Sequence, residues 1–414
     1  MSKGAVGLVA GYWPDDVYRY LAIPGLALDE GLVTRPAKRR AEHPALLWNG
    51  NRLSYQQLAD EMDRTMKAFV GHVGDQGGRV AIGVRDPVGA ATMLLGALRA
   101  RLTVLLADLS AREGLRAQLL AFQPDWVISD EEITGGLDPG IRLLTTRELS
   151  QVPQGSARPR ARLDLKAPAV AVPTIEEGGG SRLVYHSHAS LLAGAISWST
   201  FLALKEDDTL LCAGPLSTWE SLYSVLPALF RGAAAALADS REPDAVAEAV
   251  RLHHPRFMLL PMQEAFRLAS HRGLARATRE TEGLEGIFVS VTGAFGIGER
   301  RKLAHLLGKP ILTVLGNAEA GPIAASHPTW YLDAAVGIPV TNVDVWPLNP
   351  ETGNPLLIPW EAVEYGEIGV KSLMAAVAYQ TAEEAQRILE GWLRTRVVAT
   401  MDPNGLFYLR SALV

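Results

Sequence analysis

The sequence predicts an α/β protein built from two α/β subdomains and a small β subdomain. From about residue 43, short apolar runs alternate with segments of helical periodicity, which is typical of a sheet with crossover helices. A segment rich in proline and basic residues at 150–168 interrupts this pattern, and from residue 336 short alternating strands replace it. A chain of 414 residues also exceeds what one hydrophobic core usually serves. The expected subdomains are 1–160, 161–335 and 336–414.

The first α/β region begins with a clearly marked helix. Gln57 follows Ser54 by three residues, a capping box that predicts a helix start, and residues 58–73 place apolar side chains on one helical face. Strands are expected at 79–84, 103–106 and 125–129, with helices at 89–101 and 112–122 between them. Alternation of strands and helices over about 90 residues predicts a parallel sheet with right-handed crossovers.

The rest of the chain divides into a second α/β region and a β tail. Residues 170–315 repeat the alternation of strands and helices beyond the exposed linker. The tail then changes to short alternating strands at 343–346, 366–370 and 406–409, with turn residues between them. A small β subdomain is therefore expected at the end of the sequence.

Composition and charge narrow the functional classes. Hydrophobic residues make up 48% and charged residues 21%, and 40 basic against 45 acidic residues give a net charge of −5, so nothing favours nucleic acid. Asp15, Asp16 and Arg19 interrupt the N-terminal apolar residues, and other apolar runs are also short, so we expect no signal peptide, no membrane span and a cytoplasmic protein. The single cysteine, Cys212, predicts a buried small hydrophobe, because one cysteine supports neither an intrachain disulfide nor a cysteine metal cluster.

Several short motifs, taken in order, resemble those of the adenylate-forming (AMP-binding) superfamily, which includes acyl-CoA and aryl-CoA synthetases, nonribosomal adenylation domains and luciferase. They are HPALLW at 43–48, RLSYQQL at 52–58, GALRA at 96–100, HSHASL at 186–191, SVTGA at 290–294, LGNAEAGP at 315–322 and GWLRT at 391–395. The resemblance covers roughly residues 40–410 and implies the large N-terminal domain of that superfamily. In the family, a carboxylate attacks the α-phosphate of ATP, and a thiol or amine then displaces AMP, so the protein must neutralise phosphate charge.

The expected phosphate loop departs from the family pattern. Where the family has glycines and hydroxyls around a triphosphate, Glu176 and Glu177 replace a glycine and a hydroxyl. Each carboxylate beside a triphosphate would cost about 1 kcal/mol in a solvated loop, so we expect a solvated loop in place of a nucleotide clamp. The residues that could still form a degenerate phosphate loop are Thr174, Gly178, Gly179, Gly180 and Arg182.

The expected ribose site also differs from the family pattern in a way that disfavours nucleotide binding. The family's ribose-binding aspartate corresponds to Val397, whose side chain cannot accept hydrogen bonds. Arg394 of the same motif is interpreted as the solvated end of a helix. At the family's hinge this sequence has Ser411 and Ala412, and it stops at Val414, so we expect the mobile C-terminal domain to be absent.

The resemblance also implies a nucleotide or acyl pocket. Its candidate residues are His186, Trp219, Gly293, Ala294, Phe295, Gly316 and Glu319. Glu319 stands where relatives bind magnesium, and a surface turn carboxylate is an equally good interpretation. Residues 293–295 could form the wall of an adenine site or a tight turn. The side chain of Trp219 could close an acyl pocket or belong to the ordinary core. For the HSH segment with Ser187, a helix start is favoured over a nucleophile.

The functional prediction is an acyl-CoA or aryl-CoA synthetase-like protein with a degenerate ATP site. It would bind a small carboxylate, acyl or aryl ligand, or act as a partner subunit, without adenylating acids, and no cofactor is expected. One alternative is an active carboxylate ligase that uses ATP and magnesium and is completed by a C-terminal domain from another protein. A further alternative is a structural or regulatory subunit of a synthetase complex, and a homodimer is possible in each case. Neither nucleic acid nor a membrane is an expected partner.

Overall fold

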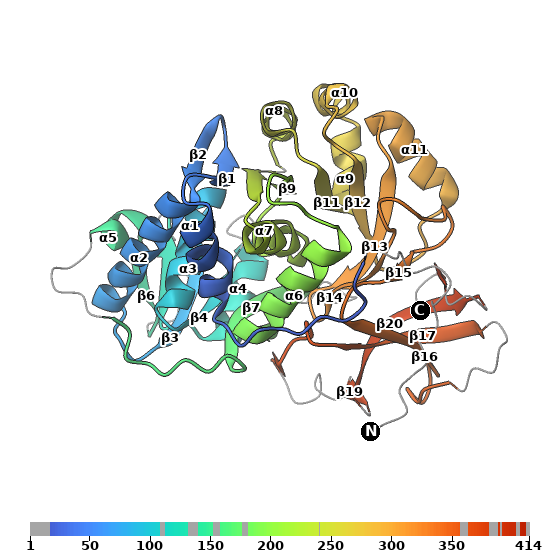
Figure 1. The fold of residues 1–414 in the computed structure, drawn as a ribbon. Helices are drawn as coiled ribbons and strands as arrows, with labels where there is room; N and C mark the ends of the chain where they lie inside the picture. The colour runs from blue at the N-terminus through green and yellow to red at the C-terminus, as the bar shows by residue number, and fades with distance from the viewer. Residues whose placement is uncertain are drawn as a thin grey trace.

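The computed structural model confirms the α/β fold with a small β subdomain (Figure 1). Two large sheets and one small sheet are present in the part of the chain that is described. The structure describes residues 17–107, 112–130, 140–151, 158–175, 181–239, 241–356, 363–380, 388–389, 391–402 and 406–410.

The first large sheet has seven strands in the order β18-β8-β7-β4-β3-β5-β6. The strands from β7 to β6 are parallel, whereas β8 and β18 are added antiparallel at one edge. The three strands predicted for the first region are confirmed as β3, β4 and β5. The strands are β3 (Gly78–Gly83), β4 (Leu102–Leu106), β5 (Trp126–Ser129), β6 (Arg142–Thr145), β7 (Pro168–Ile175), β8 (Ser181–Ser187) and β18 (Ala378–Tyr379).

Local sequence signals place the helices of this region. The Ser54 side chain accepts a hydrogen bond from the Gln57 backbone N–H and the Gln57 side chain accepts one from the Ser54 N–H, which confirms the predicted capping box. Asp86 caps the next helix through the backbone N–H of Gly89, at 2.7 Å. The helices are α2 (Tyr55–His72), α3 (Pro87–Arg99), α4 (Arg112–Phe122) and α5 (Thr146–Ser150).

The second large sheet has nine strands in the order β15-β14-β13-β12-β11-β9-β10-β1-β2. Its central strands, from β13 to β1, are parallel, and antiparallel strands complete both edges. The strands are β1 (Pro44–Trp48), β2 (Asn51–Ser54), β9 (Thr209–Ala213), β10 (Ala234–Ala238), β11 (Phe257–Pro261), β12 (Gly286–Val291), β13 (Ile311–Asn317), β14 (Gly321–Ala325) and β15 (Ile338–Pro339). Helix α6 (His188–Phe201) follows β8, and the helices that follow strands of the nine-stranded sheet are α7 (Trp219–Arg231), α8 (Pro243–His253), α9 (Met262–Ala269), α10 (Arg272–Glu280) and α11 (Ile297–Leu307).

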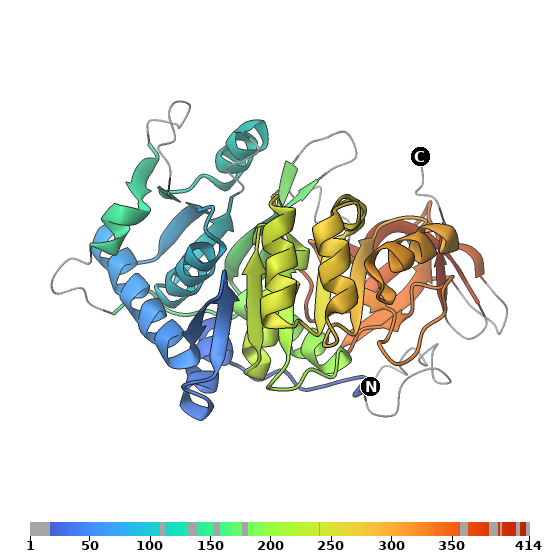
Figure 2. The same ribbon diagram turned by 90° about the horizontal axis from the view of Figure 1, so that it is seen from above.

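The two large sheets share a central layer of helices (Figures 1 and 2). Alternate residues along the strands divide between faces: Leu210 and Cys212 of β9 face this central core, whereas Leu211 and Ala213 face a second core under α8 to α11. Helix α6 lies in the central layer and is buried on almost all sides, which explains why its sequence is mostly apolar and has no charged residue between Ala189 and Phe201. Cys212 is buried as predicted, and burial raises the pKa of its thiol to about 12.

The small sheet has the order β16-β17-β20-β19, with β21 paired to β20. Arg394 lies on β20, not at a helix end, so that interpretation of the sequence is wrong. Its guanidinium donates to the carboxylate of Glu367, which is 1% exposed, so the motif arginine neutralises a buried charge inside the small subdomain. The strands are β16 (Val343–Leu348), β17 (Val363–Ser372), β19 (Ile388–Leu389), β20 (Trp392–Met401) and β21 (Phe407–Leu409).

The sheets do not divide the chain at the positions where the sequence changes composition. Strands β1 and β2 join the nine-stranded sheet, and β7 and β8 join the seven-stranded sheet although they follow residue 161. An N-terminal strap from residue 17 runs past the small subdomain to η1 (Glu30–Thr34) and α1 (Arg35–Arg39) (Figure 1). The Asn342 side chain accepts from Leu21 N–H at 2.7 Å, so the strap is fastened to that subdomain. Among the helices described, none is both long and apolar enough to cross a lipid bilayer.

Candidate functional site

Segments that are far apart in the sequence meet where β13 ends and α7 begins. The Nε2–H of His186, near the end of β8, donates to the carbonyl oxygen of Ala318 at 2.7 Å. A β-carbon added to Gly316, at the end of β13, would lie 2.5 Å from the ring of Trp219, the first residue of α7. Ligands of α/β sheets commonly bind at the carboxyl ends of the strands. The structure therefore brings together three of the predicted pocket segments, those of His186, Trp219 and Gly316.

The HSH segment forms the start of a helix, which confirms the interpretation that the sequence favoured. The Ser187 hydroxyl accepts from the backbone N–H of Ser190 at 3.0 Å and caps α6. His186 is 2% exposed, and burial lowers the pKa of its imidazole, so the ring is neutral while it donates to the carbonyl. His188 uses its Nδ1 to accept from the backbone N–H of Leu28 at 3.1 Å. Each of these polar groups has a structural partner.

Two aromatic side chains fill the space between α6, α7 and the β13–β14 hairpin. Trp219 lies against Gly316, as described above, and its ring meets that of Tyr223 edge-on, with centroids 6.2 Å apart. A β-carbon on Gly194 or on Gly321 would lie 2.4 or 2.3 Å from the Tyr223 hydroxyl. Side chains of this chain thus occupy the space beside Gly316, one of the positions predicted for a nucleotide or acyl pocket.

The Tyr223 hydroxyl is a polar atom in an apolar setting. Its residue is 2% exposed, and the oxygen has no hydrogen-bond partner among the residues that the structure describes. Burial raises the pKa of the phenol, so it is uncharged at every physiological pH. The glycines at 194 and 321 are required by this ring, because any side chain there would overlap it. No local signal predicts this packing, since Tyr223 follows the ordinary apolar pattern of α7.

Glu220 is a second site residue that sequence reasoning missed. It lies in the first turn of α7, is 7% exposed, and accepts a hydrogen bond from the Ser290 hydroxyl at 2.7 Å. Burial raises the pKa of this carboxyl group, and the Ser290 bond opposes that effect only partly. The feature of the sequence that could have indicated this site is the acidic residue in the mostly apolar first turn of α7.

Glu220 gives the protein a defined pH dependence. Its pKa is raised on folding, so above the ordinary glutamate value of about 4.3 the folded state binds more protons than the unfolded state. The contribution of Glu220 to the free energy of unfolding therefore falls as the pH rises. We expect Glu220→Gln to stabilise the protein more at pH 8 than at pH 5, measured by urea unfolding at both values. A stability difference between the variant and the parent that does not change with pH would contradict this assignment.

Glu319 is buried, so its interpretation as a surface turn carboxylate is wrong. It is 4% exposed, and its backbone is fixed because Asn317 Oδ1 accepts from the N–H groups of Glu319 and Ala320 at 3.1 and 2.8 Å. The carbonyl oxygen of Glu319 accepts from the N–H of Ala376 at 2.7 Å. In the described part of the chain, no group of three or more His, Cys, Asp or Glu side chains is placed to hold a metal ion. A role for Glu319 with magnesium stays a prediction.

The phosphate-loop residues divide between described and undescribed positions. Thr174 and Arg182 face each other in register across the β7–β8 hairpin. The residues that join the two strands, 176–180, lie outside the described part of the structure. The roles suggested for Gly178, Gly179 and Gly180 are therefore still predictions.

Val397 lies in the core. It is 8% exposed and packs in the central hydrophobic cluster, and its backbone N–H donates to the Thr395 hydroxyl at 3.2 Å. The preceding residue, Arg396, has a φ of 60°, a left-handed conformation that a glycine adopts at lower cost. The position that the resemblance assigns to ribose binding thus carries an apolar side chain directed to the core.

The three residues of the predicted adenine wall lie in different surroundings. Gly293 has open space beside its α-carbon, and Ala294 is exposed. Phe295 packs against the core under α8 to α11, which is separate from the central core that contains Trp219. Contact of Gly293 or Ala294 with a nucleotide stays a prediction.

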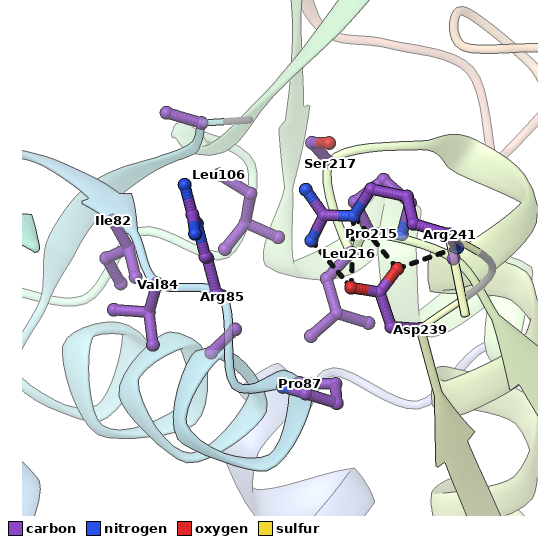
Figure 3. Close-up of a pocket in the computed structure, with 13 residues that line it drawn as sticks. Ile82, Val84, Arg85, Pro87, Leu106, Pro215, Leu216, Ser217, Asp239 and Arg241 are labelled. Atoms are coloured by element: carbon purple, nitrogen blue, oxygen red, sulfur yellow. Dashed lines mark hydrogen bonds and ion pairs between the residues drawn. The ribbon is translucent and has the colours of Figure 1, made fainter. Parts of the chain in front are cut away.

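An open groove lies between the two α/β subdomains (Figure 3). A narrow slot of about 40 Å³ has apolar walls that include Ile82, Val84, Leu106 and Leu216, and it adjoins a hollow of about 490 Å³. Figure 3 shows the side chains of Arg85 and Arg241 on opposite sides of the slot.

Both arginines of this groove are positioned by acidic residues. Asp239 holds Arg241 through a forked contact in which Nε and Nη2 donate at 3.0 and 2.7 Å to Oδ2. The backbone N–H of Arg85 donates to Asp130 at 2.8 Å, which fixes the turn after β3. The hollow has the size of ordinary small-molecule sites. A ligand with an apolar part and a negatively charged end matches these walls.

Comparison with known proteins identifies relatives of this arrangement. A family model described as AMP-binding enzyme matches residues 179–379. A curated relative, 4-coumarate–CoA ligase 5 of Oryza sativa subsp. japonica, is 27% identical over 275 residues, which cover 62% of this chain and 49% of that protein. The chain thus spans about half the length of the curated relative that it matches.

Solved structures share the fold at lower identity. The unliganded O-succinylbenzoate coenzyme A synthetase of Bacillus subtilis has a TM-score of 0.78 and 17% identity, covering 92% of this chain and 78% of that one. The N-terminal subdomain of Klebsiella oxytoca NpsA, in complex with 3-hydroxyanthranilyl-AMSN, has a TM-score of 0.78 and 21% identity, with coverage of 95% and 99%. The predicted fold is therefore confirmed over nearly the whole chain.

Proposed function

We propose that this chain is a large N-terminal domain of the adenylate-forming superfamily that does not adenylate acids but binds a small carboxylate or acyl ligand. The observation that carries the proposal is the packing of Trp219 on Gly316, with Tyr223 between Gly194 and Gly321. An acyl group that reacts with ATP needs room beside the nucleotide, and here aromatic side chains of the protein take that room.

Two further features support the loss of adenylation. Val397 is buried in the core at the position matched to the ribose-binding aspartate, so it offers no hydrogen-bond acceptor to a nucleotide. The sequence also places Glu176 and Glu177 where relatives neutralise a triphosphate. Electrostatic stabilisation and positioning supply most of the catalysis in phosphoryl chemistry, and this chain has lost groups of both kinds.

The decisive experiment measures acid-dependent pyrophosphate release. The protein is incubated with ATP, magnesium and a panel of aliphatic and aromatic carboxylates, with an active acyl-CoA synthetase as positive control. We expect release no greater than in the absence of acid. Pyrophosphate formation that rises with one acid of the panel would overturn the proposal and favour an active carboxylate ligase.

We place the proposed ligand in the groove between the α/β subdomains. Its apolar part would lie against Leu106 and Leu216, and its carboxylate would face Arg85 and Arg241. Arginine suits this role because its planar guanidinium donates two parallel hydrogen bonds to a carboxylate.

Substitution of the groove arginines tests this placement. We expect Arg85→Gln to weaken the binding of benzoate or hexanoate about tenfold or more, because a hydrogen bond to a charged group contributes about 1.5–3 kcal/mol. Arg251→Gln, on the exposed far end of α8, is the matched control and is expected to bind as the parent does. Isothermal titration gives the affinities, and equal affinity in both variants would exclude the groove.

A further inference from the structure

A second hollow, at the C-terminal end of α7, is lined mainly by cations. It has a volume of about 470 Å³ and lies between α1, the C-terminal end of α7 and the loop after α6. Helix α7 separates it from the region of Trp219 by about 20 Å, at a rise of 1.5 Å per residue. Its lining residues are Gly31, Arg35, Lys38, Arg39, Glu206, Phe230 and Arg231. We call it the α1–α7 basic pocket.

The charge of this pocket is strongly one-sided. Four cations face a single carboxylate, an excess of three positive charges on a chain whose net charge is −5. Glu206 is already engaged, because Arg39 and Arg40 lie 3.6 and 3.7 Å from its two oxygens. Arg35 and Lys38 form no hydrogen bond or ion pair with any residue that the structure describes. They are therefore available to a ligand.

The cations are arranged to act together. Arg35, Lys38 and Arg39 stand three and four residues apart, so they share one face of α1, where like charges repel each other. Arg231 approaches from α7, and its Nε donates to the carbonyl oxygen of Leu204 at 2.6 Å, which orients the guanidinium.

Helix dipoles account for only part of this arrangement. A cation in the last turn of a helix is stabilised by the helix dipole. This effect accounts for the positions of Lys38, Arg39 and Arg231, each taken separately. It explains neither Arg35, at the first position of α1, nor the convergence of two helix ends on one hollow. An anion bound between the helices would relieve the repulsion of all four charges at once.

We propose that the α1–α7 basic pocket binds a compact polyanion that carries two or more phosphate groups. Phosphate oxygens match the forked donors of arginine, and the hollow has the size of a small-molecule site. The phosphates can belong to an inorganic polyphosphate or to an organic phosphate ester. The proposal stands independently of the carboxylate groove, since the two sites share no residue.

Titration with inorganic phosphates tests the proposal. Orthophosphate, pyrophosphate and tripolyphosphate are titrated into the protein by calorimetry, beside fructose 1,6-bisphosphate as the organic ester and citrate as a non-phosphate trianion. We expect saturable binding that tightens with the number of phosphate groups and weakens with salt. Combining Arg35→Gln, Lys38→Gln and Arg231→Gln is expected to weaken tripolyphosphate binding about tenfold or more, because three of the four cations that line the pocket are removed.

Control variants distinguish binding in this pocket from binding elsewhere on the protein and from unfolding. Arg251→Gln and Arg85→Gln are expected to bind tripolyphosphate as the parent does, and an unchanged circular dichroism spectrum shows that the triple variant is folded. Unchanged affinity in the triple variant, equal binding of citrate, or binding restricted to a polyglutamate peptide or RNA would overturn the proposal. ATP binding that the triple variant loses supports this pocket, whereas acid-dependent pyrophosphate release counts only against the proposed function.

Discussion

Replacing Gly337 by alanine is expected to destabilise the protein by about 4 kcal/mol or more, which is among the largest effects of a single substitution. Gly337 has a φ of 130°, and an added β-carbon would lie 1.9 Å from the carbonyl oxygen of Ala325. That atom belongs to the backbone of β14, which pairs there with β15, so it cannot turn aside as a side chain can. Either the β14–β15 pairing opens or the chain leaves its conformation, and both changes disturb the connection to the small β subdomain.

Gly50→Ala is the matched control for Gly337→Ala. Gly50 has a φ of 75° in the turn between β1 and β2, and nothing lies within 4 Å of an added β-carbon. Alanine there costs about 1 kcal/mol for the left-handed backbone alone. Urea unfolding of both variants separates the overlap from the backbone term. Equal destabilisation of the two proteins would show that β14 moves away without cost.

Local signals predicted the helices, whereas the membership of the sheets depended on distant contacts. The capping box of Ser54 and Gln57 fixed the start of α2, because both partners lie within one turn of the helix. By contrast, β1 pairs with β10, almost two hundred residues later, through matches such as Leu46 with Ala235. Such a pairing leaves no mark on the composition around either strand. The change of composition at 150–168 likewise does not mark a sheet boundary, because β7 and β8 follow it and still join the seven-stranded sheet.

The candidate site was predictable in its motifs and not in its packing. The resemblance of the motifs put His186, Trp219 and Gly316 in one candidate pocket, and the structure places these three segments close together. Tyr223 and Glu220 lie on the same helix as Trp219, but their partners are on α6, β12 and β14. Which neighbour a helical side chain meets is set by the tertiary structure, and the sequence pattern of α7 shows only that the helix has an apolar face.

Replacing Trp219 by alanine is expected to lower the free energy of unfolding by about 3 kcal/mol, since large aromatic side chains leave both lost contacts and a cavity. Its ring covers Gly316 and meets Tyr223 edge-on, so the cavity forms beside the end of β13. An apolar cavity of this size binds an aromatic molecule that replaces the missing ring. We expect indole to raise the melting temperature of Trp219→Ala and to leave that of the parent protein unchanged.

The same variant separates two explanations for the proposed absence of adenylation. Trp346→Ala removes another half-buried tryptophan, in the small β subdomain. It serves as the control for effects that come from a general loss of stability. If Trp219 alone closes an otherwise competent site, Trp219→Ala should release pyrophosphate with ATP and benzoate. We expect no release, because opening the cavity restores neither a ribose acceptor at Val397 nor the residues that neutralise a triphosphate. Indole binding without pyrophosphate release would thus show that opening the space beside Gly316 is not sufficient for adenylation.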